Sequence, residues 1–365
     1  MTSGDDRPPR PESRPLRVGL IGCGFFARHH LAAWRELAAE GVALAAVCDL
    51  DRAKAETAAR AFGAGRAYDD PDAMLAAAPL DLVDIVTMES HRALAGLALR
   101  HGVPVVVQKP IAPTLADAAA MVEAAEAAGV PLMVHENFRF QTPLRSAREI
   151  IASGRLGRPF FARISWRTGH DVFAGQPYLA EVPRLILLDL GIHLLDLARF
   201  LFGEVASLTC RTGRVRDRIA GEDAASLLLG HTNGVATTVD MTYSARRDPD
   251  PFPETLLEVD GAAGALRLDA GYALTVADAQ GSERSCVAPP PLPWAESPWQ
   301  AIQASVLAAQ RHFIACVRAG VPAETSGRDN LATFALVEAA YRSAARGTTE
   351  HTPFHRADHE PGRAG

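Results

Sequence analysis

Short apolar runs alternate with Ala-rich helical stretches through the first third of the chain. The strand-like runs are rich in β-branched residues and lack polar alternation, and they lie at residues 17–22, 43–49, 82–87, 103–109 and 131–136. Between them lie helix-like stretches, each closed by a glycine that suits a helix cap, at residues 32–40, 51–63, 91–102 and 114–129. Such strands are typical of a parallel sheet buried on both faces by right-handed βαβ crossovers. We therefore predict a Rossmann domain over residues 16–137.

The pattern changes after residue 138. Residues 142–154 predict a helix with Thr142 as N-cap and Gly154 beyond its end. Strand-like segments follow at residues 160–168, 226–243, 255–270 and 272–278, with Asn233-Gly234 as a hairpin turn. Two further helices are expected at residues 301–319 and 330–345. Residues 138–350 are thus predicted to form an α+β domain with a largely antiparallel sheet, and the whole chain to be of the α/β class.

Composition narrows the class of protein. The chain has 365 residues, of which 48% are hydrophobic, enough for two domains between polar tails at residues 1–15 and 351–365 that we expect to be disordered. The net charge is −6, so the chain lacks the excess of basic residues that is typical of a protein that binds nucleic acid or an anionic membrane. No stretch has the length and apolarity of a membrane span, since the nearest, residues 185–202, carries Asp189, His193, Asp196 and Arg199.

The five cysteines are scattered and form no CxxC motif. Their odd number and spacing support neither a disulfide framework nor a zinc ribbon, so we expect a cytoplasmic protein in a reducing compartment.

A glycine-rich turn follows the first predicted strand. Gly22, Gly24 and Ala27 form GxGxxA just before a predicted helix, where bare main-chain N–H groups and the helix N-terminus can meet a pyrophosphate. Phe25 and Phe26 could wall the phosphates or pack on the sheet. The combination of strand, turn and helix favours a dinucleotide site.

Asp49 ends the second predicted strand. In a dinucleotide-binding Rossmann domain, a carboxylate at about this position accepts hydrogen bonds from both adenine-ribose hydroxyls. The same charge repels a 2′-phosphate, which favours NAD over NADP. Arg52 could oppose this preference by offering a cation. A plain cap of the following helix is the alternative role of Asp49.

Two strand ends are candidates to face the nicotinamide, because ligands bind outside the carboxyl ends of the strands in an open α/β sheet. Thr87 ends the predicted strand at residues 82–87, and Lys109 ends the one at residues 103–109, in the segment VVVQKP. A lysine that emerges from an apolar strand, unlike a solvated lysine on a helix, favours a functional role over a structural ion pair.

Asp189 and His193 lie four residues apart in the apolar stretch LLDLGIHLLD, so a helix would place both on one face. One interpretation is a buried hydrogen bond between them, and another is a metal site completed by Asp196 and further ligands. With a nicotinamide domain upstream, the pair is better interpreted as a general base with its neighbour.

The sequence resembles the glucose-fructose oxidoreductase, inositol dehydrogenase and rhizopine catabolism family. The resemblance extends over nearly the whole chain and rests on GCGFFA, on QKP where the family usually has EKP, on HENFRF, on DLGIHLLD and on the segment at residues 326–344. It implies a Rossmann domain joined to an open-faced sheet domain, usually paired through that sheet as a homodimer or homotetramer. It also implies reversible oxidation of a sugar or polyol hydroxyl with NAD and without a metal.

The resemblance gives Lys109, Asp189 and His193 the catalytic roles. The residues expected to contact the cofactor are Gly22, Gly24, Phe25, Phe26, Asp49, Thr87, His91, Gln108 and Lys109. Those expected to contact the substrate are Lys109, Asn137, Arg139, Trp166, Arg167, Asp189 and His193.

Two positions depart from the family pattern. Gln108 stands where a glutamate is usual, which removes a negative charge beside Lys109 and is expected to ease loss of the lysine proton. Met88-Glu89 stands where a proline is usual after the strand at residues 82–87, so cofactor contacts differ there.

Within the family, HENFRFQTP and ARRDPDPFPET resemble the branch that contains D-apiose dehydrogenase. This implies oxidation of an aldose at its anomeric carbon to a lactone. The alternatives are oxidation of a ring hydroxyl of a cyclitol or other sugar, hydride shuttling by a tightly held cofactor, and a regulatory NAD-binding protein without turnover.

Overall fold

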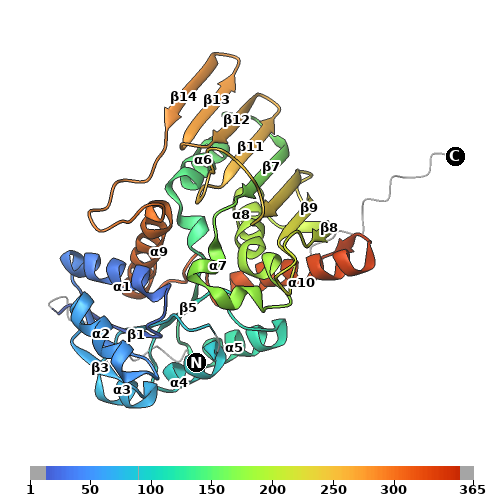
Figure 1. Cartoon of the computed structure of the whole chain (residues 1–365). Coiled ribbons are helices and arrows are strands. Elements are labelled where there is room, and N and C mark those ends of the chain that lie inside the picture. The colour runs from blue at the N-terminus through green and yellow to red at the C-terminus, as the bar shows by residue number, and fades with distance from the viewer. Residues whose placement is uncertain (1–13, 89, 354–365) are drawn as a thin grey trace, which may run out of the picture.

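The computed structural model describes residues 14–88 and 90–353 (Figure 1). The predicted tails, residues 1–15 and 351–365, therefore lie outside the described residues except for residues 14, 15 and 351–353. Glu89 also lies outside them.

The first sheet has six parallel strands in the order β3-β2-β1-β4-β5-β6, which confirms the predicted Rossmann topology. The strands are β1 (Leu16–Ile21), β2 (Val42–Cys48), β3 (Arg66–Tyr68), β4 (Leu82–Ile85), β5 (Val105–Gln108) and β6 (Leu132–His135). All four residues of β4, β5 and β6 are buried, as their unbroken apolar runs predict. The carboxyl ends of β4 and β5 lie side by side, since these two strands pair directly.

Helices connect these strands and cover the sheet. They are α1 (Ala27–Glu36), the 3₁₀-helix η1 (Leu37–Glu40), α2 (Arg52–Phe62), α3 (Pro71–Ala77), α4 (His91–Arg100) and α5 (Leu115–Ala128). The sequence patterns did not predict β3 and α3, because a three-residue strand and a seven-residue helix are too short to show a period.

A second sheet of nine strands, in the order β14-β13-β12-β11-β7-β10-β9-β8-β15, lies above the first in Figure 1. Only the β7–β10 pair is parallel, which confirms the predicted largely antiparallel sheet. The strands are β7 (Pro159–Arg167), β8 (Val205–Gly213), β9 (Ala224–His231), β10 (Ala236–Thr242), β11 (Leu256–Gly261), β12 (Gly264–Asp269), β13 (Ala273–Asp278), β14 (Gly281–Cys286) and β15 (Glu350–His351). The predicted hairpin turn joins β9 to β10, with Gly234 at a φ of +88°.

Helices pack on one face of this sheet and leave part of the other face open. The helical elements between β6 and β8 are the 3₁₀-helix η2 (Asn137–Phe140), α6 (Thr142–Ala152), α7 (Val172–Gly175), the 3₁₀-helix η3 (Pro177–Ala180), the π-helix η4 (Leu187–Gly191) and α8 (Ile192–Phe202). Thr142 is the first residue of α6 and Gln141 its N-cap, one position earlier than predicted. β8 and β14 were not predicted; all six residues of β14 are exposed, so this edge strand carries no apolar pattern.

The last two long helices bring the two sheets together. α9 (Gln300–Ala319) packs on α1 and β6, whereas α10 (Gly327–Arg346) contacts α5, α8 and β8. Between them, the main chain of Thr325 accepts a hydrogen bond of 2.8 Å from the Val134 N–H of β6. The C-terminal helices thus fix the carboxyl end of the first sheet against the second.

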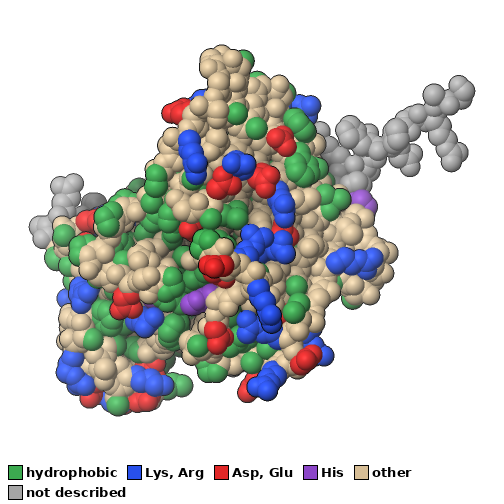
Figure 2. All heavy atoms as spheres, turned by 45° about the horizontal axis from the view of Figure 1, so that its top comes forward, with side chains coloured by type: hydrophobic (Ala, Val, Ile, Leu, Met, Phe, Trp, Pro, Cys, Tyr) green, Lys and Arg blue, Asp and Glu red, His purple; other side chains and the backbone are tan. Residues whose placement is uncertain are grey.

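None of the helices within the described ranges has the combination of length and apolarity that a bilayer crossing needs. The face of the molecule in Figure 2 carries acidic and basic side chains close to one another.

Candidate active site

The glycine-rich turn has the shape of a phosphate cradle. Gly22 has a φ of +98°, and a Cβ there would lie 2.9 Å from the carbonyl of Val86, so the close approach of the β4 end demands glycine. A Cβ at Gly24 would meet no atom within 4 Å, which leaves open space in front of the turn. α1 begins three residues later, at Ala27, and directs its free N–H groups toward this space. The turn therefore fits the pyrophosphate of a dinucleotide.

Asp49 lies beside the turn, directly after β2. Its carboxylate accepts hydrogen bonds from the main-chain N–H of Cys23, at 2.8 Å, and of Asp51, at 2.9 Å. Asp51, not Asp49, is the N-cap of α2, so a plain cap does not account for Asp49. Arg52 is bound by Glu56, at 3.1 Å, and by Asp69, at 3.4 Å. These acids compete for the only cation that was expected to favour a 2′-phosphate.

The two phenylalanines of the turn have different surroundings. Phe26 packs against the core and meets His30 edge to face at 5.7 Å between ring centroids. Phe25 contacts the second part of the chain, where a Cβ at Gly175 of α7 would lie 2.8 Å from its ring. Trp299 packs on the edge of Phe25, at 6.0 Å. Phe25 thus forms a wall between the phosphate turn and the second sheet domain.

Thr87 and His91 lie just beyond the end of β4. The imidazole of His91 is buried between two main-chain carbonyls, with Nε2 2.7 Å from Thr87 O and Nδ1 3.1 Å from Pro110 O. The ring thereby lies between the loops after β4 and β5, and its one N–H in the neutral form donates to one of the two carbonyls. Burial lowers the pKa of His91, although the carbonyl hydrogen bonds oppose this shift.

Gln108 faces away from the lysine ammonium and into a buried polar chain. Its Oε1 accepts from the Lys109 N–H at 3.0 Å, which makes its Nε2 the donor to His30 Nε2 at 2.7 Å. His30 must then carry its proton on Nδ1, which lies 2.7 Å from Asp84 Oδ2. The chain Asp84–His30–Gln108 therefore holds the backbone of Lys109. This arrangement gives Gln108 a positioning contact, whereas the sequence had suggested an effect on the lysine proton.

Lys109 joins the two parts of the chain through Asp189. Its Nζ donates to Asp189 Oδ1 at 2.6 Å and to the Asp189 main-chain carbonyl at 2.7 Å. Asp189 lies in η4, and a π-helical turn leaves carbonyls outside the regular helical ladder. Both side chains keep some exposure, 17% for Lys109 and 19% for Asp189. An ammonium with three N–H groups thus has one left for a ligand at this opening.

The carboxylate of Asp189 has a second partner, Tyr243, whose hydroxyl donates to Oδ2 at 2.6 Å. Burial alone would raise the pKa of Asp189, but the Lys109 ammonium and the two hydrogen bonds lower it below its usual value. Burial and the charge of Asp189 raise the pKa of Tyr243 well above its usual value. Asp189 is therefore ionised at neutral pH, and Tyr243 remains a donor.

His193 follows in α8 and has a different partner from Asp189. Its Nδ1 is hydrogen-bonded to Oε1 of Glu136, and Phe138 stacks on its ring with centroids 4.0 Å apart and planes 5° apart. In residues 14–88 and 90–353, no group bonds to Nε2 of His193. A carboxylate can only accept, so Nδ1 carries the proton and Nε2 is left bare as a base. The interpretation of Asp189 and His193 as a directly hydrogen-bonded pair is wrong, because Asp189 bonds to Lys109 and Tyr243 and His193 bonds to Glu136.

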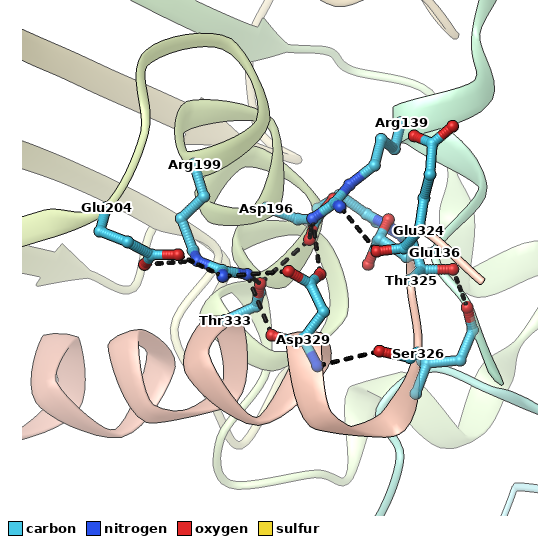
Figure 3. A network of polar contacts seen from close by, with 12 residues as sticks. Glu136, Arg139, Asp196, Arg199, Glu204, Glu324, Thr325, Ser326, Asp329 and Thr333 are labelled. Carbon is cyan, nitrogen blue, oxygen red and sulfur yellow. Dashed lines mark hydrogen bonds and ion pairs between the residues drawn. The ribbon is translucent and has the colours of Figure 1, made fainter. Parts of the chain in front are cut away.

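Arg139 and Asp196 belong to a separate network at the start of α10 (Figure 3). Arg139 is 6% exposed and forms a bidentate pair with Asp196, at 2.5 and 2.8 Å. Its guanidinium also contacts Asp329 at 2.9 Å. These contacts occupy Arg139 in holding η2, α8 and α10 together, although the sequence had suggested a substrate contact. They also turn Asp196 away from Asp189 and His193, so these three do not converge as metal ligands.

The other expected substrate residues lie in three places. Asn137 is buried and donates to Ser305 Oγ of α9 at 2.7 Å. Trp166 lies on the covered face of β7, with its ring 6.0 Å from Tyr243 and 6.1 Å from Phe138. Arg167 points to the opposite, open face, because side chains alternate along a strand, and lies 3.8 Å from Asp240. Trp166 is thus brought to the Lys109 cluster, and Arg167 is not.

Sequence reasoning missed Glu136 as a member of this site. Glu136 directly follows the carboxyl end of β6, and such strand ends carry functional residues in open α/β sheets. The hydrogen bond of Tyr243, directly after β10, to Asp189 was not predicted, because its partner lies 54 residues earlier in the chain.

Two family models match the chain. The model described as the oxidoreductase family with an NAD-binding Rossmann fold matches residues 16–136. The model described as the GFO/IDH/MocA C-terminal domain matches residues 144–267.

Individual relatives match over most of the chain. It is 54% identical to D-apiose dehydrogenase of Paraburkholderia graminis over 335 residues, which cover 92% of this chain and 89% of the relative. It is 50% identical to D-apiose dehydrogenase of Rhizobium rhizogenes, with 92% and 96% covered. Its fold matches the crystal structure of an oxidoreductase from Agrobacterium radiobacter in complex with NAD+, L-tartaric acid and magnesium, with a TM-score of 0.90, 50% identity, and 92% and 98% of the chains covered.

Proposed function

This chain belongs to the GFO/IDH/MocA oxidoreductases, whose N-terminal domain is an NAD-binding Rossmann fold, and we propose that it oxidises D-apiose at its anomeric carbon to a lactone. The relatives that carry this activity in their names are at least half identical to the chain. Residues 16–137 would hold NAD, and residues 138–350 would hold the sugar.

One observation carries the proposal. A lysine from the cofactor domain and an aspartate from the second domain meet at the carboxyl end of β5, with a bare histidine nitrogen nearby on the following helix. This edge of a Rossmann sheet is where the cofactor lies. The arrangement combines a cationic donor for a substrate oxygen with a base for its proton, which suits the oxidation of a hydroxyl.

The roles of the residues follow from their contacts. The free N–H of Lys109 donates to the anomeric oxygen and stabilises the charge that develops there. His193 takes the hydroxyl proton on Nε2 as the C1–H bond breaks and the C=O bond forms. Asp189 orients Lys109 through its two hydrogen bonds. NAD, when bound, supplies the nicotinamide that accepts the hydride, so the products are lactone, NADH and a proton.

The turn and strand ends would hold the cofactor. Gly22 and Gly24 leave room for the pyrophosphate, and the free lone pairs of Asp49 accept from the ribose hydroxyls. Thr87, with the loop that His91 braces, and the Gln108-Lys109 segment would border the nicotinamide. Phe25 would close the cleft on the side of α7.

The test is NADH formation over a panel of aldoses, cyclitols and sugar acids, with NAD and NADP in parallel. We expect turnover with D-apiose and NAD, and a product that hydrolyses to an acid on standing, as a lactone does. A stable ketone would instead support oxidation of a ring hydroxyl. Copurifying cofactor that a second sugar reoxidises would support hydride shuttling. Binding of NAD without turnover on any member of the panel would contradict the enzymatic proposal.

The open face of the second sheet suggests pairing of two copies. Phe161 of β7 and Leu228 of β9 point to this face and are 38% and 53% exposed. Arg163 and Asp240 pair between them, at 2.9 Å. We therefore propose a homodimer, or a homotetramer built from it, with this face at the interface. Light scattering should show a monomer for Leu228→Arg, and an unchanged mass would contradict the proposal.

The cysteines favour the cytoplasm as the compartment. All five are free thiols, and burial raises the pKa of the Cys48 thiol to about 12. Fractionation of the native host with an enzyme assay would test this localisation.

A further inference from the structure

Glu136 has no part in the roles described so far, yet its position is unusual. It is fully buried, 0% exposed, one residue beyond β6. Its Oε1 accepts from His193 Nδ1, and in the described part of the chain Oε2 has no hydrogen-bond partner. A buried carboxylate with an unpaired oxygen destabilises a fold, and such costs concentrate at functional sites.

Glu136 acts together with Phe138 on the same ring. The carboxylate lies at the edge of the imidazole and the phenyl ring lies flat against its face, at 4.0 Å between centroids. An edge contact and a face contact together allow one orientation of His193. Both residues lie directly after β6, Glu136 as the N-cap of η2 and Phe138 within it, whereas His193 belongs to α8.

One cation, the Arg139 guanidinium, lies near the Glu136 carboxylate. Arg139, three residues later in the same segment, is close enough to interact electrostatically with Glu136: burial would lower the pKa of Arg139, but the charges of Asp196, Asp329 and Glu136 raise it. Arg139 is bonded to Asp196 and Asp329 rather than to Glu136. The carboxylate therefore keeps one direct partner, which is His193.

We propose that Glu136 is the positioning residue of the active site: it holds the proton on Nδ1 of His193, directs the bare Nε2 into the cleft, and stabilises the imidazolium that forms when the sugar proton arrives. This inference rests on the proposed role of His193 as base. A carboxylate behind a catalytic histidine has this effect in other hydrogen-bonded acid–base pairs. Phe138 maintains the plane of the ring.

The first experiment compares Glu136→Gln with Glu136→Asp in the full chain. The glutamine keeps the shape but loses the charge, so we expect kcat to fall on the order of a hundredfold, with the KM for sugar and the affinity for NADH within about threefold. The aspartate keeps a carboxylate but on a shorter side chain, farther from His193, so it should recover part of the lost kcat. Glu204→Gln is the matched control, because it removes a carboxylate that pairs with Arg199 at 2.7 Å elsewhere on α8, and it should leave kcat unchanged.

A double variant separates positioning from a structural role. If Glu136 acts through His193, adding Glu136→Gln to His193→Ala should lower kcat by no more than about twofold further. A further loss of tenfold or more overturns the inference, as does a folded Glu136→Gln enzyme with kcat within threefold of wild type. If the glutamine variant does not fold, Glu136→Asp is the deciding variant. An Asp variant whose KM for sugar rises while its kcat stays at the wild-type value overturns the inference.

A measurement without turnover distinguishes this inference from the proposed function. Nitrogen NMR of the His193 ring, assigned with His193→Ala, should show a protonated Nδ1 and a bare Nε2 in the wild type and a mixture of forms in Glu136→Gln. A wild-type ring protonated on Nε2 alone would refute the positioning role even for an active enzyme. Silence over the whole sugar panel would refute the proposed function and leave the ring result standing.

Discussion

Replacing Lys109 by methionine removes the ammonium that joins the two parts of the chain at Asp189. The variant loses two hydrogen bonds, of 2.6 and 2.7 Å, and leaves the carboxylate with Tyr243 alone. Burial then acts on Asp189 without the opposing cation, so its pKa should rise from its lowered value. The change tests the pair both as a structural link and as part of the site.

The magnitude follows from the exposure of the pair. Exposed ion pairs contribute about 0–1 kcal/mol, and breaking a fully buried pair costs about 3–5 kcal/mol. With side chains 17% and 19% exposed, Lys109 and Asp189 lie between these limits, and we expect a coupling energy of about 2 kcal/mol. For turnover, we expect a loss of at least about a hundredfold, because the donor to the substrate oxygen is gone.

The assay is a double-variant cycle of Lys109→Met and Asp189→Asn, measured by urea unfolding and by NADH formation. NADH affinity should stay within about threefold, since the phosphate turn and Asp49 are untouched. Lys54→Met is the matched control: Lys54 is 61% exposed and pairs with Asp51 only at 3.9 Å, so its loss should change the free energy of unfolding by less than about 0.5 kcal/mol. The reasoning would be refuted if the effects of the two substitutions on the free energy of unfolding were additive, or if Lys109→Met had full activity.

Three further outcomes follow from the same contacts. Burial, assisted by the charge of Arg28, lowers the pKa of His29 to about 3. Below about pH 6.5 the unfolded chain therefore binds more protons than the folded one, and the free energy of unfolding should fall as pH drops, by about 2 kcal/mol at about pH 5. His29→Asn should flatten this pH dependence in urea titrations. Gln108→Glu turns an acceptor toward the accepting Nε2 of His30, so the free energy of unfolding should fall by about 1–3 kcal/mol; an unchanged free energy of unfolding in urea titrations would contradict this network. Asp49→Ser should lower the NAD-to-NADP ratio of kcat/KM at least about tenfold, and an unchanged ratio would remove Asp49 from the cofactor site.

Much of the site is local in the chain, and the sequence predicted that part. The GxGxxA turn, Asp49 and Lys109 lie at strand ends, and the order of strands and helices determines which edge of the sheet those ends share. Alternation along β7 is also a local property, but which of Trp166 and Arg167 faces the site depends on which face α8 covers. The sequence pattern placed both at the sugar, whereas the sheet turns Arg167 to its open side.

The sequence by itself determined the Rossmann topology, the phosphate turn and the presence of a lysine, an aspartate and a histidine suited to hydride transfer. The tertiary structure decided their partners. Asp189 pairs with Lys109 and Tyr243, 80 and 54 residues away, and His193 pairs with Glu136, 57 residues away. Short-range periodicity reports only which face of an element is apolar, whereas a hydrogen bond between distant segments depends on how the sheets and the π-turn of η4 bring those segments together.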